Sequence, residues 1–221
     1  MAETALLDND VVLKACCYDL DGQAVAALSG WGLAPAMLAA ARFVIASRIS
    51  KSRSISDRAT ASAAFARALQ AIGPIEPTDA EIAFAAALEQ QAQASGLELD
   101  VGESQLVSIL LSRDLPLLLT GDKRAVAAIE ALVGDQFAAP AVAALEQLFV
   151  ELLGELDAGA LRRNICREPK VDRSLTICFG CASVAVAIGD IYDGLRSYIA
   201  NLRSVAPRVL LASDDLSAVV P

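Results

Sequence analysis

The chain has 221 residues, a net charge of −9 and a hydrophobic content of 55%, which allows one substantial core and argues against a disordered protein. It contains no histidine, which excludes Ser-His-Asp and Cys-His catalysis and the histidine-based zinc hydrolase sites. Any chemistry must therefore depend on carboxylates, lysine, hydroxyl groups or cysteine, and carboxylates with a hard divalent cation are the first candidates.

The mean hydropathy of +0.49 is high, but the longest apolar stretches fall short of the about 20 residues that cross a bilayer. The chain begins with the acidic sequence MAETALLDND, whereas a signal peptide begins with basic residues. We therefore expect a cytoplasmic protein with no membrane partner. Its excess apolar surface is expected to be buried in a homodimer or against another protein.

The first elements are predicted from short patterns. The apolar run at residues 4–7 predicts a buried strand, and Asp8-Asn9-Asp10 then suits the start of a helix. Apolar residues at helical spacing continue to residue 20, where Asp21-Gly22 is expected to end that helix as a turn.

Three more helices are expected before residue 95. The first covers residues 33–47, with Pro35 in its first turn, and the second covers residues 59–72, before the stop at Gly73-Pro74. The third begins at PTDAE, where Thr78 and Glu81 have the spacing of a capping box, and runs to about residue 94.

The segment LELDVGESQLVSILLSRDLPLLLTGDKRAVAAIE, residues 97–130, is the most informative part of the chain. It predicts a helix that opens near Glu103, a fully buried strand at residues 115–119, and a helix from Lys123 that follows Asp122. Carboxylates thus follow two strands, at Asp8 and Asp122, and ligands bind at the carboxyl ends of strands in open α/β sheets.

A short strand at residues 137–142 and a helix at 145–153 are expected next. Beyond them, residues 165–180 look irregular, residues 184–202 look helical, and the tail after Pro207 looks extended. We therefore predict an α/β domain over residues 1–155 and a mainly helical C-terminal extension over residues 156–221.

The five cysteines are expected to be free, mostly buried thiols. They are Cys16, Cys17, Cys166, Cys178 and Cys181. Only the last two form a CxxC motif, and a structural zinc site needs four ligands, so a metal site at this segment is the less favoured alternative.

Three segments of the chain resemble the PIN-like domain family: LLDNDVVL, LDVGESQLVSIL and LLLTGDKRA, in this order, within residues 4–148. The resemblance implies a three-layer α/β/α sandwich with a parallel sheet. It also implies divalent-metal-dependent cleavage of RNA by clustered acidic side chains.

Position by position, the resemblance assigns catalysis to Asp8, Glu103 and Asp122. The same three residues with Asp10 are expected to bind Mg²⁺ or Mn²⁺, because clustered carboxylates hold such ions and leave positions for water and phosphate. The basic residues that would contact the RNA phosphates are Lys123, Arg124 and the cluster Arg42, Arg48, Lys51, Arg53 and Arg58.

One departure from the family pattern bears on activity. The pattern has a further acidic residue on an early helix, and residues 33–47 contain none. Glu81 is a candidate substitute from another helix. Without it, a folded PIN-like protein that is catalytically inert and serves as an interaction module is the alternative.

Each carboxylate also has a purely structural interpretation. Asp8, Asp10 and Asp122 stand where helix caps occur, and Glu103 in a first helical turn interacts favourably with the helix dipole. Their shared placement at the ends of strands is what favours a site.

A second alternative arises from the string DLDG at residues 19–22, which resembles the nucleophile motif of haloacid-dehalogenase-type phosphatases. Asp19 would be the nucleophile and Asp21 the acid/base, with Thr120 and Lys170 as further motif residues and Asp190 with Asp193 binding Mg²⁺. The motif order agrees with that family, but Gln23 stands where threonine is usual, and the spacing of Asp190 and Asp193 is one residue short. We therefore favour a surface position for Asp19 at the end of a helix.

Overall fold

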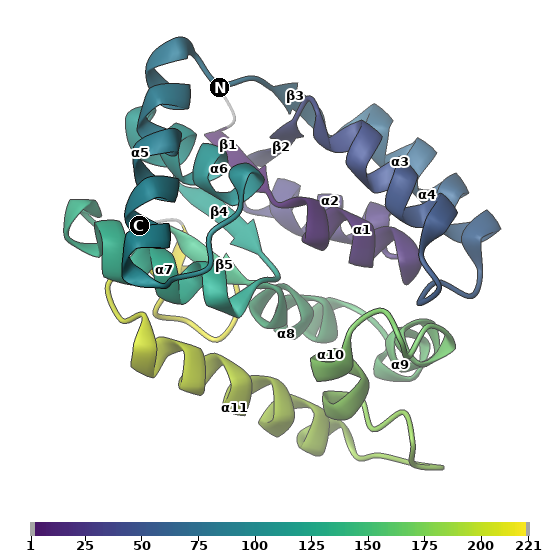
Figure 1. The fold of residues 1–221 in the computed structure, drawn as a ribbon. Coiled ribbons are helices and arrows are strands. Elements are labelled where there is room, and N and C mark those ends of the chain that lie inside the picture. Colours follow the sequence, from purple (N-terminus) through teal and green to yellow (C-terminus); the bar gives the residue numbers. More distant parts are fainter. Residues whose placement is uncertain (1–2, 220–221) are drawn as a thin grey trace.

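The protein folds around a five-stranded sheet in which all neighbouring strands are parallel (Figure 1). The computed structural model describes residues 3–219. The strand order is β3-β2-β1-β4-β5, so β1 is central. The strands are β1 (Glu3–Leu7), β2 (Leu33–Leu38), β3 (Gly73–Ile75), β4 (Leu117–Thr120) and β5 (Val142–Ala144).

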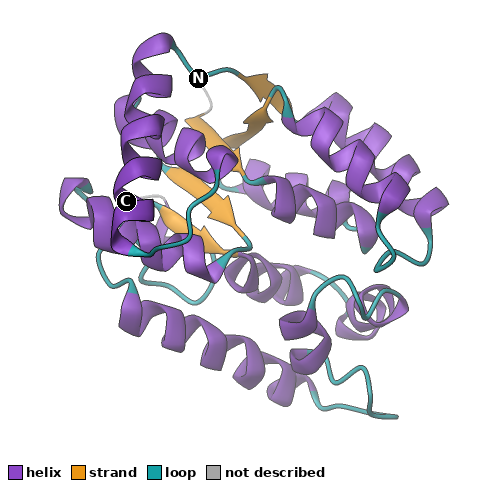
Figure 2. Cartoon of the chain, viewed as in Figure 1, coloured by secondary structure: helices purple, strands orange, loops and turns teal. Residues whose placement is uncertain are grey.

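Helices cover both faces of this sheet (Figure 2). The helices are α1 (Asn9–Cys17), α2 (Asp21–Gly30), α3 (Ala41–Lys51), α4 (Arg58–Ala71), α5 (Asp79–Ser95), α6 (Val101–Ser112), α7 (Lys123–Val133), α8 (Leu145–Glu155), α9 (Ala158–Arg167), α10 (Arg173–Cys178) and α11 (Ile188–Val205), with 3₁₀ turns η1 (Gly134–Gln136) and η2 (Ser217–Val219). Helices α1 to α4 pack together on one side of the sheet and α5 to α7 on the other. The strands run outwards from β1 to β3 and then return to β4 and β5, and right-handed crossovers in these two opposite directions place their helices on opposite faces. The α/β class, the parallel sheet and the helical layers agree with the fold class that the sequence predicts.

The expected helix at residues 33–47 is wrong in its first half. Residues Leu33–Leu38 form β2, and α3 begins only at Ala41. The short apolar run is buried almost throughout, and such a run has no periodicity that separates a buried strand from a buried helix. Pro35 is tolerated because β3 pairs only with residues 36–38, so the missing N–H removes no bond on that side.

The expected turn at Asp21-Gly22 is also wrong. Helix α1 ends at Cys17, and Asp19 provides the turn with a positive φ of 55°, a conformation that aspartate adopts more readily than most residues. Asp21 then opens α2, where its negative charge favours the helix N-terminus.

Later elements differ less from the prediction. The capping box of Thr78 and Glu81 at the start of α5 is confirmed. The strand expected at residues 137–142 is instead β5, which starts at Val142. Residues 165–180 are more regular than expected, because Asp172 caps the short helix α10 by accepting a hydrogen bond from the Leu175 N–H at 2.8 Å.

The expectation of free thiols is wrong for two of the five cysteines. Cys166 and Cys181 form a disulfide, with a Cα–Cα distance of 5.1 Å. Cys16, Cys17 and Cys178 are free and buried, as expected. The CxxC motif therefore does not pair with itself: its second cysteine reaches back to the end of α9.

The core joins the sheet to the C-terminal helices. Buried residues of the strands, of both helical layers and of α9 to α11 belong to one hydrophobic cluster. Within it Tyr18, Phe149 and Phe179 form a chain of edge-to-face contacts, with ring centroids 6.1 and 6.0 Å apart. The domain division near residue 155 remains a prediction. Within residues 3–219, no helix is both long and apolar enough to cross a membrane.

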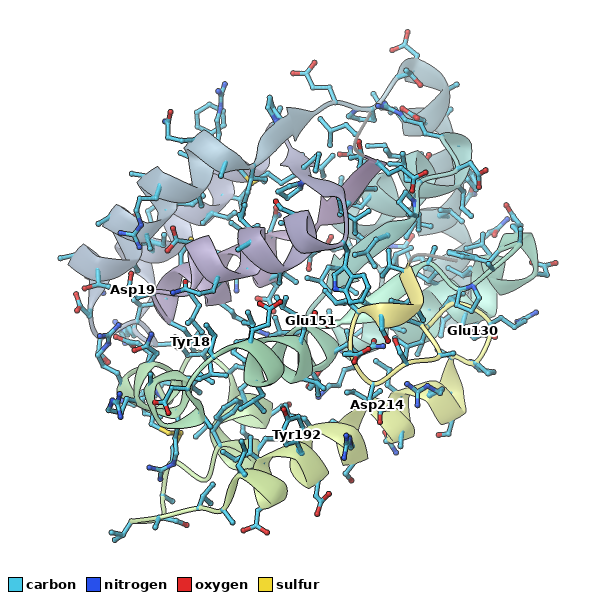
Figure 3. The ribbon with its side chains drawn as sticks, turned by 180° about the vertical axis from the view of Figure 1, so that it is seen from behind. Tyr18, Asp19, Glu130, Glu151, Tyr192 and Asp214 are labelled. Atoms are coloured by element: carbon cyan, nitrogen blue, oxygen red, sulfur yellow. A yellow bond between two sulfur atoms is a disulfide. The ribbon has the colours of Figure 1, made fainter. Side chains whose placement is uncertain are left out.

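Glu130 of α7 fixes the C-terminal segment beside the sheet (Figure 3). Its buried carboxylate accepts hydrogen bonds from the backbone N–H groups of Arg208 and Val209, at 3.0 and 3.2 Å, and from Arg208 Nε at 2.6 Å. These contacts hold the chain where Leu210 makes a parallel bridge with Val142.

Replacing Glu130 with alanine leaves two backbone N–H groups without their acceptor, so we expect a loss of about 2–4 kcal/mol in the free energy of unfolding. Urea denaturation of Glu130→Ala and Glu130→Gln measures this loss, and the glutamine variant should lose less. Glu155→Ala, at an exposed helix end, is the matched control. A Glu130→Ala variant as stable as the control would contradict this role.

Candidate functional site

The carboxyl ends of β1 and β4 form the centre of the candidate site. Asp8 follows β1 directly, and its N–H donates to the Leu119 carbonyl at 3.0 Å, so the two strand ends lie side by side. The connections from β1 and β4 leave in opposite directions across the sheet, and this reversal of strand order opens a crevice where ligands bind in α/β folds.

A cleft of about 510 Å³ lies at this point. Its lining residues are Asp8, Asn9, Asp10, Lys14, Val44, Arg48, Asp100, Glu103, Gly121, Asp122, Lys123, Arg124, Glu146, Asp172 and Ser174. The set includes the four predicted metal ligands with Lys123 and Arg124, although these six residues come from three separate parts of the chain, and it includes Arg48 of the predicted basic cluster. Seven carboxylates face four cationic side chains, so the cleft has an excess of negative charge.

Asp8 occupies the N-cap position of α1 but makes no capping hydrogen bond with its side chain. The carboxylate is buried, 6% exposed, and within residues 3–219 its one side-chain hydrogen bond is a long one of 3.3 Å from Thr120 Oγ1. Burial, followed by the negative charges of Asp10 and Asp100, raises the pKa of Asp8 to about 6. The structural interpretation of Asp8 as a cap therefore does not account for its position.

Glu103 lines the same cleft as Asp8 and lies in the first turn of α6. It forms a capping box with Asp100: Glu103 Oε2 accepts from the Asp100 N–H and Asp100 Oδ1 accepts from the Glu103 N–H, both at 2.8 Å. Burial above all, with the nearby charges of Asp100, Asp8 and Asp122, raises the pKa of Glu103 to about 8. Glu103 thus has a structural role, and when it is ionised it adds to the repulsion among the carboxylates of the cleft.

Asp122 has the capping role that its sequence position suggests. Its Oδ1 accepts from the Arg124 N–H at 2.8 Å, and its Oδ2 pairs with Arg124 Nη2 at 2.9 Å. Partial burial raises the pKa of Asp122, but the hydrogen bonds from Arg124 outweigh it and leave the pKa below its usual value. Asp122 is therefore the most easily ionised of the three predicted catalytic residues.

Lys123 and Arg124 line the cleft but are engaged by carboxylates. Lys123 Nζ pairs with Glu146 at 2.6 Å, donates to Ser174 Oγ at 2.9 Å and lies 3.9 Å from the ring centroid of Tyr198. Arg124 binds Glu98 as well as Asp122. A phosphate would have to compete with these partners.

Asp10 belongs to an ion-pair network that the sequence does not predict. Lys14, one turn further along α1, binds Asp10 and also pairs with Asp172 at 2.6 Å, and Arg48 reaches Asp10 at 3.3 Å. Burial lowers the pKa of Lys14, but Asp10 and Asp172 outweigh it and raise the pKa. A Cβ at Gly121 would lie 2.7 Å from Asp10 Oδ2, so a larger residue there would displace the Asp10 side chain from this network.

Sequence reasoning missed Lys14, Asp100, Glu146, Asp172 and Ser174. The four-residue spacing from Asp10 to Lys14 on a helix is a signal that could have found Lys14. Asp172 and Ser174 reach the cleft only through tertiary folding of the C-terminal segment, so local pattern carries no signal for them.

The early helix contributes no carboxylate, in agreement with the sequence. Helix α3 contains no acidic residue and faces the cleft with Val44 and Arg48. Glu81 does not replace the missing group. It pairs with Arg113 at 2.7 Å, near the opposite end of α6 from Glu103, and that bond, which outweighs burial, lowers its pKa to about 2.

The geometry disfavours the phosphatase alternative. Asp19 follows helix α1 rather than a strand and lies at that helix's far end (Figure 3), where Asp19 and Asp21 both pair with Arg67 at 2.6 and 2.7 Å. Thr120 instead binds Asp8, and neither Lys170 nor Asp190 lines the cleft.

Across residues 3–219, no group of three or more Cys, Asp or Glu side chains is placed so that it could hold a metal ion as the side chains stand. The carboxylates of the cleft are spread around it and mostly engaged by cations or caps, with Asp8 the least engaged. The chain matches no protein-family model, no curated protein and no solved structure. The functional argument therefore depends on the geometry of the cleft.

The raised pKa values of Asp8 and Glu103 each make a contribution to stability that depends on pH. The folded state holds a proton on Asp8 up to about pH 6 instead of 3.8, and on Glu103 up to about pH 8 instead of 4.5. Since the folded state binds these protons more tightly than the unfolded chain, stability should fall as the pH rises through these intervals.

Asp8→Asn removes the ionised group, so at pH 8 we expect this variant to be more stable than wild type by roughly 1–3 kcal/mol. The gain should vanish below pH 4, where Asp8 is protonated in both states. Thermal denaturation across pH 3.5–8 measures the difference. Asp19→Asn, half-exposed beside Arg67, is the control that should gain nothing. A loss of stability in Asp8→Asn at pH 8 would contradict this account and support a purely structural role for Asp8.

Proposed function

We propose that this chain is a PIN-like, divalent-metal-dependent ribonuclease with its site in the cleft at the ends of β1 and β4. The observation that carries the proposal is Asp8, a buried carboxylate that has no cationic partner and no capping role within residues 3–219, beside further carboxylates. Burying such a group is unfavourable unless a cation or a proton neutralises it, so the position favours cation binding.

The ligand set proposed for Mg²⁺ or Mn²⁺ is Asp8 with Asp10, Glu103 and Asp122. Their oxygen-only chemistry suits these hard ions. Such an ion would activate water as a Lewis acid and neutralise charge on a phosphate. The raised pKa of Glu103, about 8, would be lowered by a bound cation, because the cation offsets the negative charges around it.

The α3 surface supports RNA as the substrate. Residues 22–56 contain no acidic side chain, and α3 with the loop after it presents Arg42, Arg48, Lys51 and Arg53 on a chain of net charge −9. Phe43 is 66% exposed, with the Arg42 guanidinium 4.6 Å from its ring centroid, while Arg48 lies on the wall of the cleft. A basic strip with an exposed aromatic ring suits a single strand, whose bases stack on such rings.

A second candidate, an inert PIN-like interaction protein, is favoured by the internal pairing of the cleft's lysines. Lys14 is held by Asp10 and Asp172, and Lys123 by Glu146. Lysines that are paired with carboxylates in this way are not free to bind phosphate, which favours a protein without nuclease activity. Metal binding separates the two candidates.

Isothermal titration calorimetry at pH 8 should detect Mn²⁺ binding by the wild-type protein in the micromolar-to-millimolar range. Asp8→Asn together with Asp122→Asn should abolish it, because two ligands with full negative charge are lost. Asp19→Asn should bind like wild type. Wild-type protein that binds no Mn²⁺ at millimolar concentration would favour the inert candidate.

Binding of a fluorescently labelled single-stranded RNA, measured by anisotropy, tests the α3 surface. Phe43→Ala should weaken binding about 5- to 100-fold, the effect of losing one stacked base. Leu69→Ala, another exposed apolar residue on the neighbouring helix α4, is the matched control and should have no effect. Equal affinities of the Phe43 and Leu69 variants would exclude this surface from RNA binding.

A further inference from the structure

Residues 174–189 carry no charged side chain, yet part of this stretch is exposed to solvent. Among the described residues, nine large hydrophobic side chains are exposed, and three of them lie here: Ile177, Val184, which is fully exposed, and Ile188. The centre of the stretch is the apolar loop, residues 179–187, between α10 and α11. Exposed apolar side chains that gather in one place mark a surface that binds a partner.

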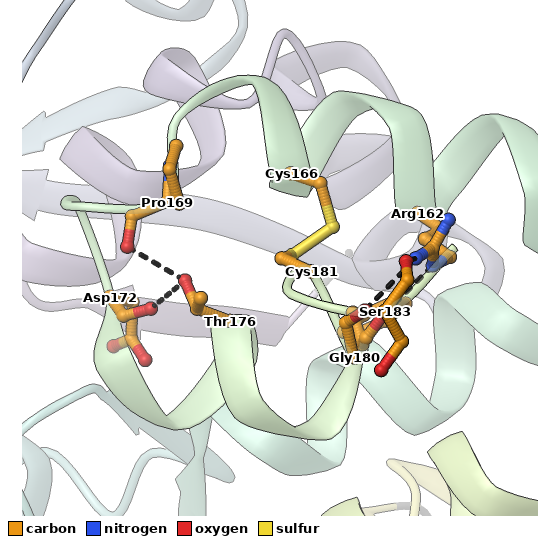
Figure 4. Close-up of a disulfide and its surroundings, with 9 residues drawn as sticks. Arg162, Cys166, Pro169, Asp172, Thr176, Gly180, Cys181 and Ser183 are labelled. Atoms are coloured by element: carbon orange, nitrogen blue, oxygen red, sulfur yellow. Dashed lines mark hydrogen bonds between the residues drawn. A yellow bond between two sulfur atoms is a disulfide. The ribbon is translucent and has the colours of Figure 1, made fainter. Parts of the chain in front are cut away.

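The apolar loop is held in one position from outside. Arg162 of α9 donates to the carbonyl oxygens of Gly180 and Ser183, at 2.9 and 2.6 Å (Figure 4). The Cys166–Cys181 disulfide also joins the loop to the end of α9. Because the loop is already ordered, binding a partner there costs little conformational entropy.

The two ends of the apolar loop are anchored from inside as well. Phe179 is fully buried and contacts Phe149 edge to face. Gly180 has a positive φ of 54°, and Val186 packs so closely against it that a Cβ on Gly180 would lie 2.5 Å from Val186 Cγ2. The loop thus directs two apolar side chains inwards, whereas Val184 between them stays in solvent.

Charged side chains of opposite sign lie on different sides of the apolar loop. In Figure 1 the loop projects at the lower right, with α9 above it and α11 extending to the left. Cations are exposed on α9 and up to the start of α10, and anions are exposed in the first two turns of α11. They are Arg163, Arg167, Lys170 and Arg173, and Asp190 and Asp193.

Most of these charged groups have no partner within one copy of the chain. Across residues 3–219, only Arg163 of the six makes an ion pair, with Asp157 at 4.0 Å. Three cations and two anions at the edge of an apolar surface are therefore free to bind groups of the opposite sign.

This pattern is complementary to itself. A two-fold axis through the apolar loop places the α9 side of one copy against the α11 side of the other. The cations of each copy then face Asp190 and Asp193 of the second copy, and the exposed apolar side chains meet in the centre. An apolar centre within a polar rim is the usual composition of a protein interface.

We propose that the apolar loop is the centre of a two-fold interface between two copies of this chain. The residues that line the cleft do not include any of the exposed side chains of this surface. The inference therefore goes beyond the proposed function and does not depend on it. Because each copy buries only three large apolar side chains there, the dimer is expected to be weak, with a Kd of about 1–100 µM.

Sedimentation equilibrium of the full chain, without metal or RNA, measures this association. The mass should rise from the 23.0 kDa of one chain to twice that value as the concentration passes through the expected Kd. Val184→Asp places a charge in the centre of the interface twice and should weaken the dimer at least about 30-fold. Val205→Asp, at an exposed apolar position at the other end of α11, is the matched control and should dimerise like wild type.

Charge reversal tests the two-fold arrangement itself. Arg167→Glu with Lys170→Glu makes both sides of the loop acidic, and Asp190→Lys with Asp193→Lys makes both sides basic, so neither double variant should dimerise alone. An equal mixture of the two should form a mixed dimer with a Kd within about tenfold of wild type, because each reversed side then faces the opposite sign. Recovery in the mixture also shows that both variants are folded.

Wild-type protein that stays monomeric above the expected Kd would overturn the interface. Equal association of the Val184 and Val205 variants would place the contact elsewhere and overturn it as well. A mixture of the charge-reversed variants that stays monomeric would exclude the two-fold arrangement. None of these outcomes bears on Mn²⁺ binding in the cleft, so the inference and the proposed function can fail separately.

Discussion

The burial of the Asp8 carboxylate at the end of the central strand is the constraint on which the site depends. The sheet order reverses at β1, so the residue after β1 must open onto the crevice beside β4. Its side chain turns from the cap position of α1 towards Thr120, and no cationic side chain of the described part of the chain pairs with it. Natural proteins accept such unfavourable groups mainly where function requires them.

Several other carboxylates of the cleft are neutralised by cationic side chains. Lys14, Arg48, Lys123 and Arg124 each bind at least one carboxylate of the cleft, and these pairs tie α1, α3, α7 and the C-terminal segment to the strand ends. Asp8 is outside this pairing. The paired carboxylates thus hold the elements together, and the unpaired carboxylate of Asp8 provides one position for a further cation.

The elements that were predicted correctly are those whose start or burial depends on residues close together in the sequence. Strands β1 and β4, the capping box of α5 and the start of α7 at Asp122 follow from short patterns in the sequence. Strand β2 could not be predicted with the same method, because its fully apolar run fits a buried helix equally well. The carboxylates at the strand ends were predicted for the same reason as the strands, since a parallel sheet gathers those ends at one edge.

The partners of these carboxylates could not be predicted. Asp172 reaches Lys14, and Cys166 reaches Cys181, only because α10 folds back over the end of α9. The distance in sequence between Asp172 and Lys14 gives no clue to this contact. The roles of Asp8 and Glu103 likewise separate only in the structure, where one has no capping bond and the other completes a capping box.

The most direct measurement is a crystal structure of the protein soaked in Mn²⁺ at pH 8, with anomalous diffraction recorded to locate the ion. An anomalous peak at coordinating distance from the Asp8 carboxylate, with Asp10, Glu103 or Asp122 turned towards it, is the expected result. A soaked crystal with no peak in the cleft, or with a peak only elsewhere on the surface, would contradict the proposal that Asp8 is kept buried and unpaired to bind a cation.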